Sequence, residues 1–175
     1  MTPEPIPQPE FSRPVNVGQL PHSGRSMMIE ANAAECAALA RRFGLPAIAS
    51  LRAELHLAPL AGARVGLSGR LAARLTQVCV VSLEPFDQEV EAPVALVFVP
   101  RAAIEAATGA LDPDAVDEEP YDGQSLDVGE AVAQTLSLAL DPWPRNPDSE
   151  LPAAGDGASA VPPAGPFAAL ARRVR

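Results

Sequence analysis

The 175-residue chain contains no lysine, so all 13 of its basic residues are arginine. Aromatic residues make up only 4% of it, which predicts a core of many small alanine and leucine contacts. Arginine suits bidentate contacts to carboxylate or phosphate. The formal net charge of −9 argues against indiscriminate binding to nucleic acid or anionic membranes.

Cysteine and histidine are equally scarce. Cys36 and Cys79 exclude a disulfide framework, and with His22 and His56 they match no zinc-binding spacing. We therefore expect two reduced, buried, poorly reactive thiols, no metal and no cofactor. The N-terminus lacks the basic and apolar regions of a signal peptide, and no apolar run approaches the ~20 residues of a membrane span. These absences predict a cytoplasmic protein without a membrane partner.

Proline and glycine divide the chain into three parts. Residues 1–10 are predicted to form a flexible tail, and residues 11–145 a single domain with an acidic loop at 112–122. Residues 146–175, rich in proline, alanine and glycine, predict a disordered tail that allows a short terminal helix.

Two main helices are expected within the domain. The first runs from Asn32 to Phe43, with Asn32 and Glu35 in capping-box positions and Gly44 at its end. The second begins at Asp127, has Glu130 at the box position, and is closed by Pro142. Its predicted buried face consists of Val128, Val132, Leu136, Ala139 and Leu140.

Three segments alternate apolar and polar residues with a period of two, at 51–57, 64–76 and 86–98. This pattern predicts half-buried antiparallel strands, and the short connections favour a meander. Shorter extended segments lie at 11–17 and 26–30. The fold class is thus α+β: a mostly antiparallel sheet, with a meander of three long strands plus short N-terminal strands, packed by two main helices.

No catalytic constellation is evident. Ser68 and His56 occupy polar strand positions without a nucleophile elbow, and the Glu118–Glu119 pair lies in a predicted loop that cannot position an acid and a base. We therefore expect no enzymatic activity and no small-molecule substrate.

Arg52, Arg70 and Arg74 share the polar face of the first two long strands. Pairing through the 59–63 loop is predicted to set Leu57 opposite Val65 and Arg52 opposite Arg70. The third strand would then set Arg74 opposite Asp87 with Arg70 opposite Glu91, or Arg74 opposite Glu89. Two interpretations stay open: a ladder of exposed ion pairs, or a surface that meets phosphate.

Two longer motifs carry a resemblance. QVCVVSLEPF, from Gln77 to Phe86, and SLDVGEAVAQTLSLALDPWPR, ending at Arg145, resemble the YceD family in its alphaproteobacterial branch. Members of this family are called large ribosomal RNA subunit accumulation proteins. FSRPV, AECAALARRFGL, SLRAEL and GRLAARLTQVC add to a resemblance that covers about residues 10–145. The matching positions are Gln77, Cys79, Glu84, Pro85, Asp127, Gly129, Glu130, Leu138, Pro142 and Pro144.

The resemblance implies a non-enzymatic, cytoplasmic bacterial factor that supports synthesis, processing or stability of 23S ribosomal RNA. Its partner would be the large-subunit RNA or a pre-ribosomal particle, reached directly or through a protein. The alternative is an adaptor that docks a ribosomal protein or RNA-processing enzyme without touching RNA. Many relatives carry further cysteines, but Val80 and Val81 follow Cys79 here.

Besides the three strand arginines, Trp143 and Arg145 are candidate RNA- or partner-binding residues. Trp143 stands between two prolines, so its backbone is restricted on both sides. Its ring is expected either to pack on Leu138 or Leu140 or to contact a partner.

Overall fold

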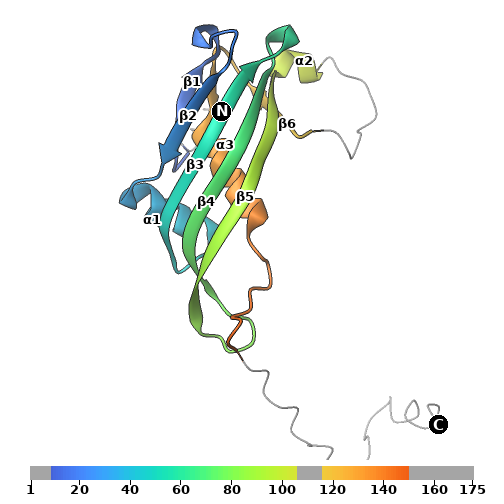
Figure 1. Cartoon of the computed structure of the whole chain (residues 1–175). Helices are drawn as coiled ribbons and strands as arrows, with labels where there is room; N and C mark the ends of the chain where they lie inside the picture. The colour runs from blue at the N-terminus through green and yellow to red at the C-terminus, as the bar shows by residue number, and fades with distance from the viewer. Residues whose placement is uncertain (1–8, 106–115, 150–175) are drawn as a thin grey trace, which may run out of the picture.

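A computed structural model describes residues 9–105 and 116–149 (Figure 1). Five strands form one sheet in the order β2-β3-β4-β5-β6, and β1 pairs with β7 in a separate two-stranded sheet. The pairing is antiparallel except between β5 and β6, which run parallel. The predicted α+β class with a mostly antiparallel sheet is confirmed.

The three long strands form the expected meander and are longer than the alternation indicated. They are β3 (Ala47–Pro59), β4 (Val65–Val78) and β5 (Pro85–Pro100). The two N-terminal segments supply β1 (Pro14–Asn16) and β2 (Arg25–Glu30), of which only β2 joins the large sheet. Short 3-10 turns lie at Val17–Gln19 and Ala61–Ala63.

The predicted pairing of the first two long strands is wrong by two residues. Leu57 faces Leu67 rather than Val65, Arg52 faces Ala72, and Arg70 faces Glu54. The turn lies one residue further along the chain than expected: Gly62 and Ala63 both adopt left-handed backbone angles, and β3 pairs as far as Pro59. The observed register also replaces two opposed arginines with an acid–base pair.

For the next pair of strands, one of the two predicted registers is confirmed: Arg74 faces Glu89. Arg70 faces Pro93 in this register and reaches Glu91 diagonally, with 3.6 Å between Nη1 and Oε2.

Both main helices lie on the same face of the sheet, with α1 (Ala33–Phe43) against β3 and α3 (Val128–Ala139) against β5 and β4 (Figure 1). The Asn32–Glu35 capping box and the left-handed Gly44 are as predicted. In α3 the buried stripe stops at Leu136; Ala139, predicted to be buried, is exposed and Leu140 only half-buried.

Glu130 differs from its predicted capping role. Its carboxylate accepts two hydrogen bonds from the guanidinium of Arg42, at 2.9 and 2.7 Å. This pair joins α3 to α1 across the helical layer.

The predicted acidic loop at 112–122 contains a strand. β6 (Glu118–Tyr121) pairs with the end of β5, and β7 (Ser125–Asp127) follows it. Buried Tyr121 anchors β6 by donating from its hydroxyl to the Ala63 carbonyl at 2.6 Å. A short helix, α2 (Arg101–Glu105), follows β5; residues 106–115, including the first part of the predicted loop, lie outside the described residues.

The two predicted tails are described only at their inner ends. Glu10 forms an ion pair with Arg42 at 2.9 Å. Asn146 and Ser149 form a turn, with the Ser149 N–H donating to the Asn146 carbonyl at 3.0 Å. Residues 1–8 and 150–175 lie outside the described residues.

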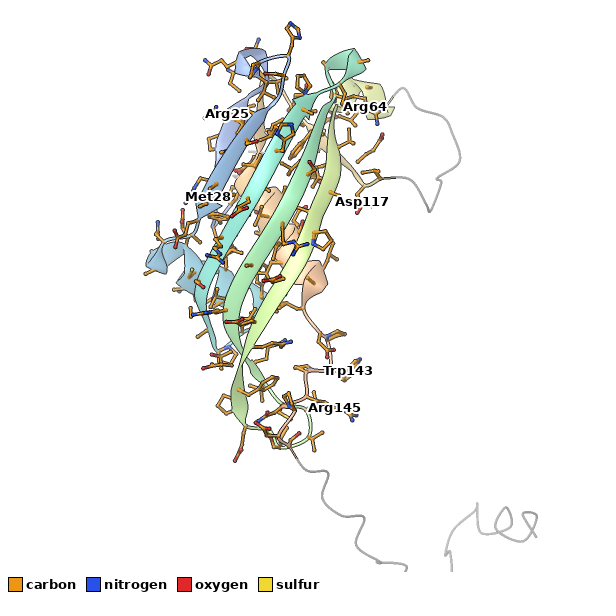
Figure 2. All side chains as sticks on the ribbon, viewed as in Figure 1. Arg25, Met28, Arg64, Asp117, Trp143 and Arg145 are labelled. Carbon is orange, nitrogen blue, oxygen red and sulfur yellow. The ribbon has the colours of Figure 1, made fainter. Side chains whose placement is uncertain are left out.

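The core fills the space between the helices and the inner face of the sheet, where the alternating apolar residues of β3, β4 and β5 are buried. The outer face of the sheet carries the polar half of the alternation and is open to solvent (Figure 2). The fold therefore offers two surfaces for function: this open face, and the end of the sheet where β4 turns into β5.

Candidate functional site: the motif tip

The two family-like motifs meet at one end of the molecule. We call this region the motif tip and define it as residues 77–85 and 141–149, the segments that join β4 to β5 and that follow α3 (Figure 2). The Val80 N–H donates to the Pro144 carbonyl at 2.9 Å, and the Gln77 side-chain amide donates to the Asp141 carbonyl at 3.3 Å. Residues more than 60 positions apart are thus held together.

Cys79 lies at the centre of the tip. The backbone N–H groups of Val81, Ser82 and Asn146 point at its Sγ, with N···S distances of 3.4, 3.5 and 3.4 Å. The Cys79 backbone closes the hairpin loop, since its N–H donates to the Glu84 carbonyl and its carbonyl accepts from the Leu83 N–H, both at 2.9 Å. Both motifs therefore use this one sulfur atom to fix their loops.

These donors change the chemistry of the thiol. The Ser82 hydroxyl and N–H, followed by the Asn146 N–H, lower the pKa of Cys79 to about 6. Cys79 is 0% exposed but lies outside the main core cluster, and desolvation opposes this shift less than the hydrogen bonds favour it. Cys36 behaves as predicted for a buried thiol, because desolvation raises its pKa. Both thiols are free and buried, as predicted, and the direction of the pKa shift distinguishes Cys79 from Cys36.

A pH-dependent contribution to stability follows. The folded-state pKa of Cys79 lies below the ordinary thiol value of about 8.5, so its contribution is fully present above about pH 8.5 and is lost as the pH falls towards 6. We expect the difference in melting temperature between the wild type and Cys79→Ser to grow from pH 6 to pH 8.5. A pH-independent difference would show that the thiolate is not stabilised in the folded state.

The other residues of the first motif have structural roles at the tip. Pro85 opens β5 opposite Val78, and the Glu84 backbone closes the loop on Cys79. Gln77 is only 5% exposed, and its Oε1 has no hydrogen-bond partner.

Trp143 and Arg145 are presented outward from the tip (Figure 2). The Trp143 N–H donates to the Asp141 carboxylate at 2.9 Å, which together with the flanking prolines fixes the turn. The indole itself is 73% exposed, so the expectation that it packs on Leu138 or Leu140 is wrong. Leu138 and Leu83 are also exposed, so large apolar side chains gather uncovered at this end.

Asp127, Gly129 and Glu130 lie at the opposite end of α3, about 18 Å away for a 12-residue helix. Asp127 caps the helix and also accepts hydrogen bonds from Ser12 and Arg13. The second motif therefore divides into a structural junction at its start and a surface element at its end.

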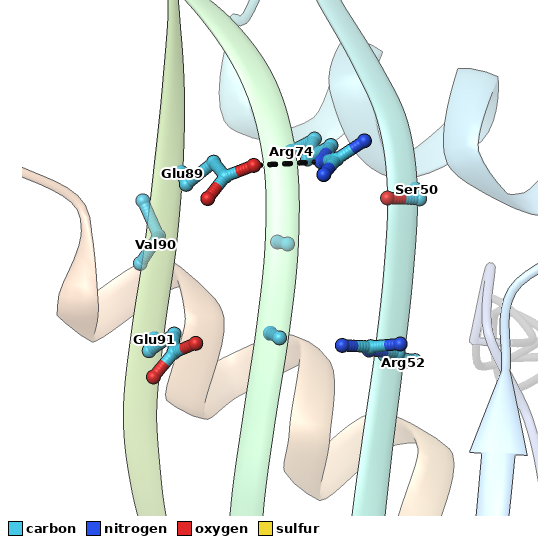
Figure 3. A pocket seen from close by; sticks show the side chains of 8 residues that line it. Ser50, Arg52, Arg74, Glu89, Val90 and Glu91 are labelled. Carbon is cyan, nitrogen blue, oxygen red and sulfur yellow. Dashed lines mark hydrogen bonds and ion pairs between the residues drawn. The ribbon is translucent and has the colours of Figure 1, made fainter.

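The strand arginines occupy the open face of the sheet (Figure 3). Arg74 is paired with Glu89, with 2.8 Å between Nε and Oε1, and Arg70 is paired with Glu91. Arg52 lines a hollow of about 240 Å³ together with Ser50 and Arg74, and the described residues give it no ion pair. The structure thus does not bring the arginines together with Trp143 and Arg145.

Sequence reasoning missed the residues that complete the tip, above all Asp141, Ser82 and Asn146. The Asp-Pro-Trp spacing was the available signal for Asp141, because aspartate before a turn commonly accepts from the backbone two residues later. No such signal existed for the donors to Cys79, since Val81 and Ser82 act through the conformation of the loop and Asn146 is 67 residues away.

The described residues contain neither a cluster of metal ligands nor a helix that could span a membrane. Nowhere in residues 9–105 and 116–149 do three or more histidine, cysteine, aspartate or glutamate side chains gather in a way that would hold a metal ion. None of the helices in these ranges is long and apolar enough to cross a membrane.

The chain was compared with known proteins. No curated protein and no solved structure matches it. The sequence model of one family, described as Large ribosomal RNA subunit accumulation protein YceD, matches residues 67–171. This range contains the whole motif tip and α3. It omits residues 10–66, where the resemblance begins, and it extends beyond Arg145. The assignment to the alphaproteobacterial branch stays a prediction. The match covers more than half of the chain and both motifs that meet at Cys79, and the chain therefore belongs to the YceD family.

Proposed function

We propose that this protein is a non-enzymatic, cytoplasmic factor that supports the accumulation of 23S ribosomal RNA in a bacterial cell, through its synthesis, processing or stability. The observation that carries the proposal is the family match over residues 67–171, whose family name denotes accumulation of the large-subunit RNA. Depletion of the protein should lower 23S RNA relative to 16S RNA. An unchanged ratio would contradict the proposal.

We further propose that it acts as an adaptor for a protein partner rather than by binding RNA directly. The charges of the open sheet face support this mode. Arg52, Arg70 and Arg74 share that face with five carboxylates, those of Glu30, Glu54, Asp87, Glu89 and Glu91. With carboxylates outnumbering arginines, this face lacks the positive field that phosphate binding requires.

Affinity purification of the full-length protein, with and without nuclease, distinguishes the two modes. An adaptor should retain the same basic protein partner after the RNA has been digested. Retention of large-subunit precursors only while the RNA is intact would instead establish direct RNA contact.

The arginine face supplies a second test. We expect the Arg70→Ala/Arg74→Ala variant to lose less than ~1 kcal/mol of unfolding free energy, because both ion pairs are exposed. It should also leave 23S RNA levels unchanged. Arg52→Glu is the variant that tests RNA binding by this face most sensitively. Arg52 lacks an ion pair among the described residues and projects from the open face (Figure 3). Reduced 23S RNA at equal expression, together with a salt dependence of RNA binding that flattens by about one unit per lost contact, would restore the RNA-binding interpretation.

A further inference from the structure

A cleft at the motif tip has no assigned role. Three segments line it: the end of α1 with the turn after it, the end of β4 with the start of the next loop, and the end of α3 with the turn after it. The lining residues are those at 43–46, Gln77, Val78, Val80, Ser137, Leu140, Asp141, Pro142 and Pro144. Its volume is about 470 Å³, within the range of pockets that hold a small ligand or side chains of a partner. We refer to it as the motif cleft.

The motif cleft is lined by hydrogen-bond acceptors. Gln77 is almost fully buried, and its Nε2 is committed to the Asp141 carbonyl. That bond fixes the orientation of the amide, since the flipped side chain would set oxygen against oxygen. Among the described residues its Oε1 has no partner, and an unpaired buried acceptor costs about 1–3 kcal/mol. A donor supplied by a bound molecule would recover this energy.

The electrostatic environment favours a cationic donor. Both main helices end at the cleft, and helix C-termini carry partial negative charge. The last turn of α3 contains no basic residue. The last turn of α1 contains Arg41 and Arg42, but neither belongs to the lining of the cleft, and Arg42 is paired with Glu10 and Glu130. The carboxylate of Asp141 adds a full negative charge to the lining.

The rim of the cleft is apolar and exposed. Val78 and Val80 belong to the lining and are 43% and 40% exposed. Trp143 is 73% exposed and stands on the fixed turn between Pro142 and Pro144, which both line the cleft. A rigid exposed tryptophan loses little entropy on binding, and tryptophan is enriched at the energetic centres of protein interfaces. An apolar rim around a negative, acceptor-lined interior suits a side chain with an apolar stem and a cationic tip.

We propose that the motif cleft binds a segment of a protein partner in which an arginine is flanked by apolar residues. The guanidinium enters the cleft and donates to Gln77 Oε1 and the Asp141 carboxylate, while the flanking apolar side chains contact Val78, Val80 and Trp143. The net charge of −9 attracts such a basic partner over longer distances. This inference deepens the proposed adaptor function and rests on it for its biological setting.

The test titrates full-length protein with an acetylated, amidated peptide of alternating leucine and arginine. Trp143 is the single tryptophan, so its fluorescence reports binding at the rim. We expect the arginine peptide to bind at least tenfold more tightly than the same peptide with citrulline, which keeps the shape and removes the charge. Equal affinity of the two peptides, or no binding by either, would overturn the proposal.

Matched variants assign the contact. Gln77→Leu should weaken binding of the arginine peptide at least tenfold. Because it removes the hydrogen bond to the Asp141 carbonyl as well as the unpaired oxygen, binding is measured where circular dichroism shows that the variant is folded. Gln88→Leu is the control, since Gln88 Oε1 is likewise unpaired but lies away from the cleft, and it should bind as the wild type does. Loss of binding in both variants, or in neither, would contradict the assignment.

Other occupants give distinct results. Tighter peptide binding by full-length Phe167→Ser would mean that the chain's own C-terminal segment holds the cleft. A dimer that Gln77→Leu dissociates would assign the cleft to a second copy, and either result would overturn a partner segment. If the peptide does not bind but depletion of the protein still lowers 23S RNA, the proposed role of the cleft is wrong and the proposed function stands. If the peptide binds but depletion leaves 23S RNA unchanged, only the proposed function is wrong.

Discussion

Gly129→Ala should lower the free energy of unfolding by about 2–3 kcal/mol, although alanine is intrinsically the better helix former by ~1 kcal/mol. A Cβ at this position would lie 2.4 Å from the Phe11 carbonyl oxygen and 2.9 Å from the Arg13 nitrogen. Both are backbone atoms, and Phe11 is completely buried, so neither can move aside without displacing the chain that leads into β1. The closeness of the two backbones is what requires glycine here.

Gly66→Ala is the matched control for chemical denaturation. The nearest atom to a Cβ there is a Leu60 side-chain carbon at 3.5 Å, an ordinary contact. Its effect should stay within about 0.5 kcal/mol. If Gly129→Ala were instead stabilising, as in an exposed helix, the N-terminal chain would not lie against α3 as the structure has it.

The sequence correctly predicted the elements of this fold that depend on residues close together in the chain. Asn32, Glu35 and Gly44 bound α1 as expected because caps act within a few residues. The period-two pattern located the meander for the same reason: it depends on which side of each strand faces the core.

Long-range contacts account for what the sequence could not reveal. The register of β3 with β4 depended on left-handed angles at Gly62 and Ala63, and Ala63 gave no signal of this. The acidic composition of β6 favoured a loop in the sequence. The strand forms through parallel pairing with the end of β5, which is distant in sequence and leaves no local signal. The shifted pKa of Cys79 depends on N–H groups from two separate loops, one of them contributed by Asn146, 67 residues away. Gln77 and Pro142 belong to two separate sequence motifs, and only the fold shows that they line one cleft.

The second large effect is expected at Asp127, where the same junction depends on one carboxylate. Asp127 caps α3 by accepting from the Gly129 and Glu130 N–H groups at 2.9 and 3.2 Å. It also accepts from the Arg13 N–H at 2.7 Å and the Ser12 hydroxyl at 2.5 Å. Asp127→Ala removes an N-cap worth about 0.5–2 kcal/mol. It also leaves the part-buried Arg13 N–H without an acceptor, at a cost of about 1–3 kcal/mol. Together these losses predict a destabilisation of about 3 kcal/mol.

Two further substitutions separate this role from a general loss of charge. Asp127→Asn keeps an acceptor oxygen for the backbone donors and should cost only about 1 kcal/mol, since asparagine is an equally good N-cap. Asp122→Ala removes an exposed carboxylate that pairs with Arg101 at 2.9 Å, and should cost less than ~1 kcal/mol. If Asp127→Ala proves as mild as Asp122→Ala, the strand β1 is not held to α3 through this side chain. If Asp127→Asn is as damaging as Asp127→Ala, the negative charge rather than the hydrogen bonds holds the junction, because the asparagine retains the geometry and loses only the charge.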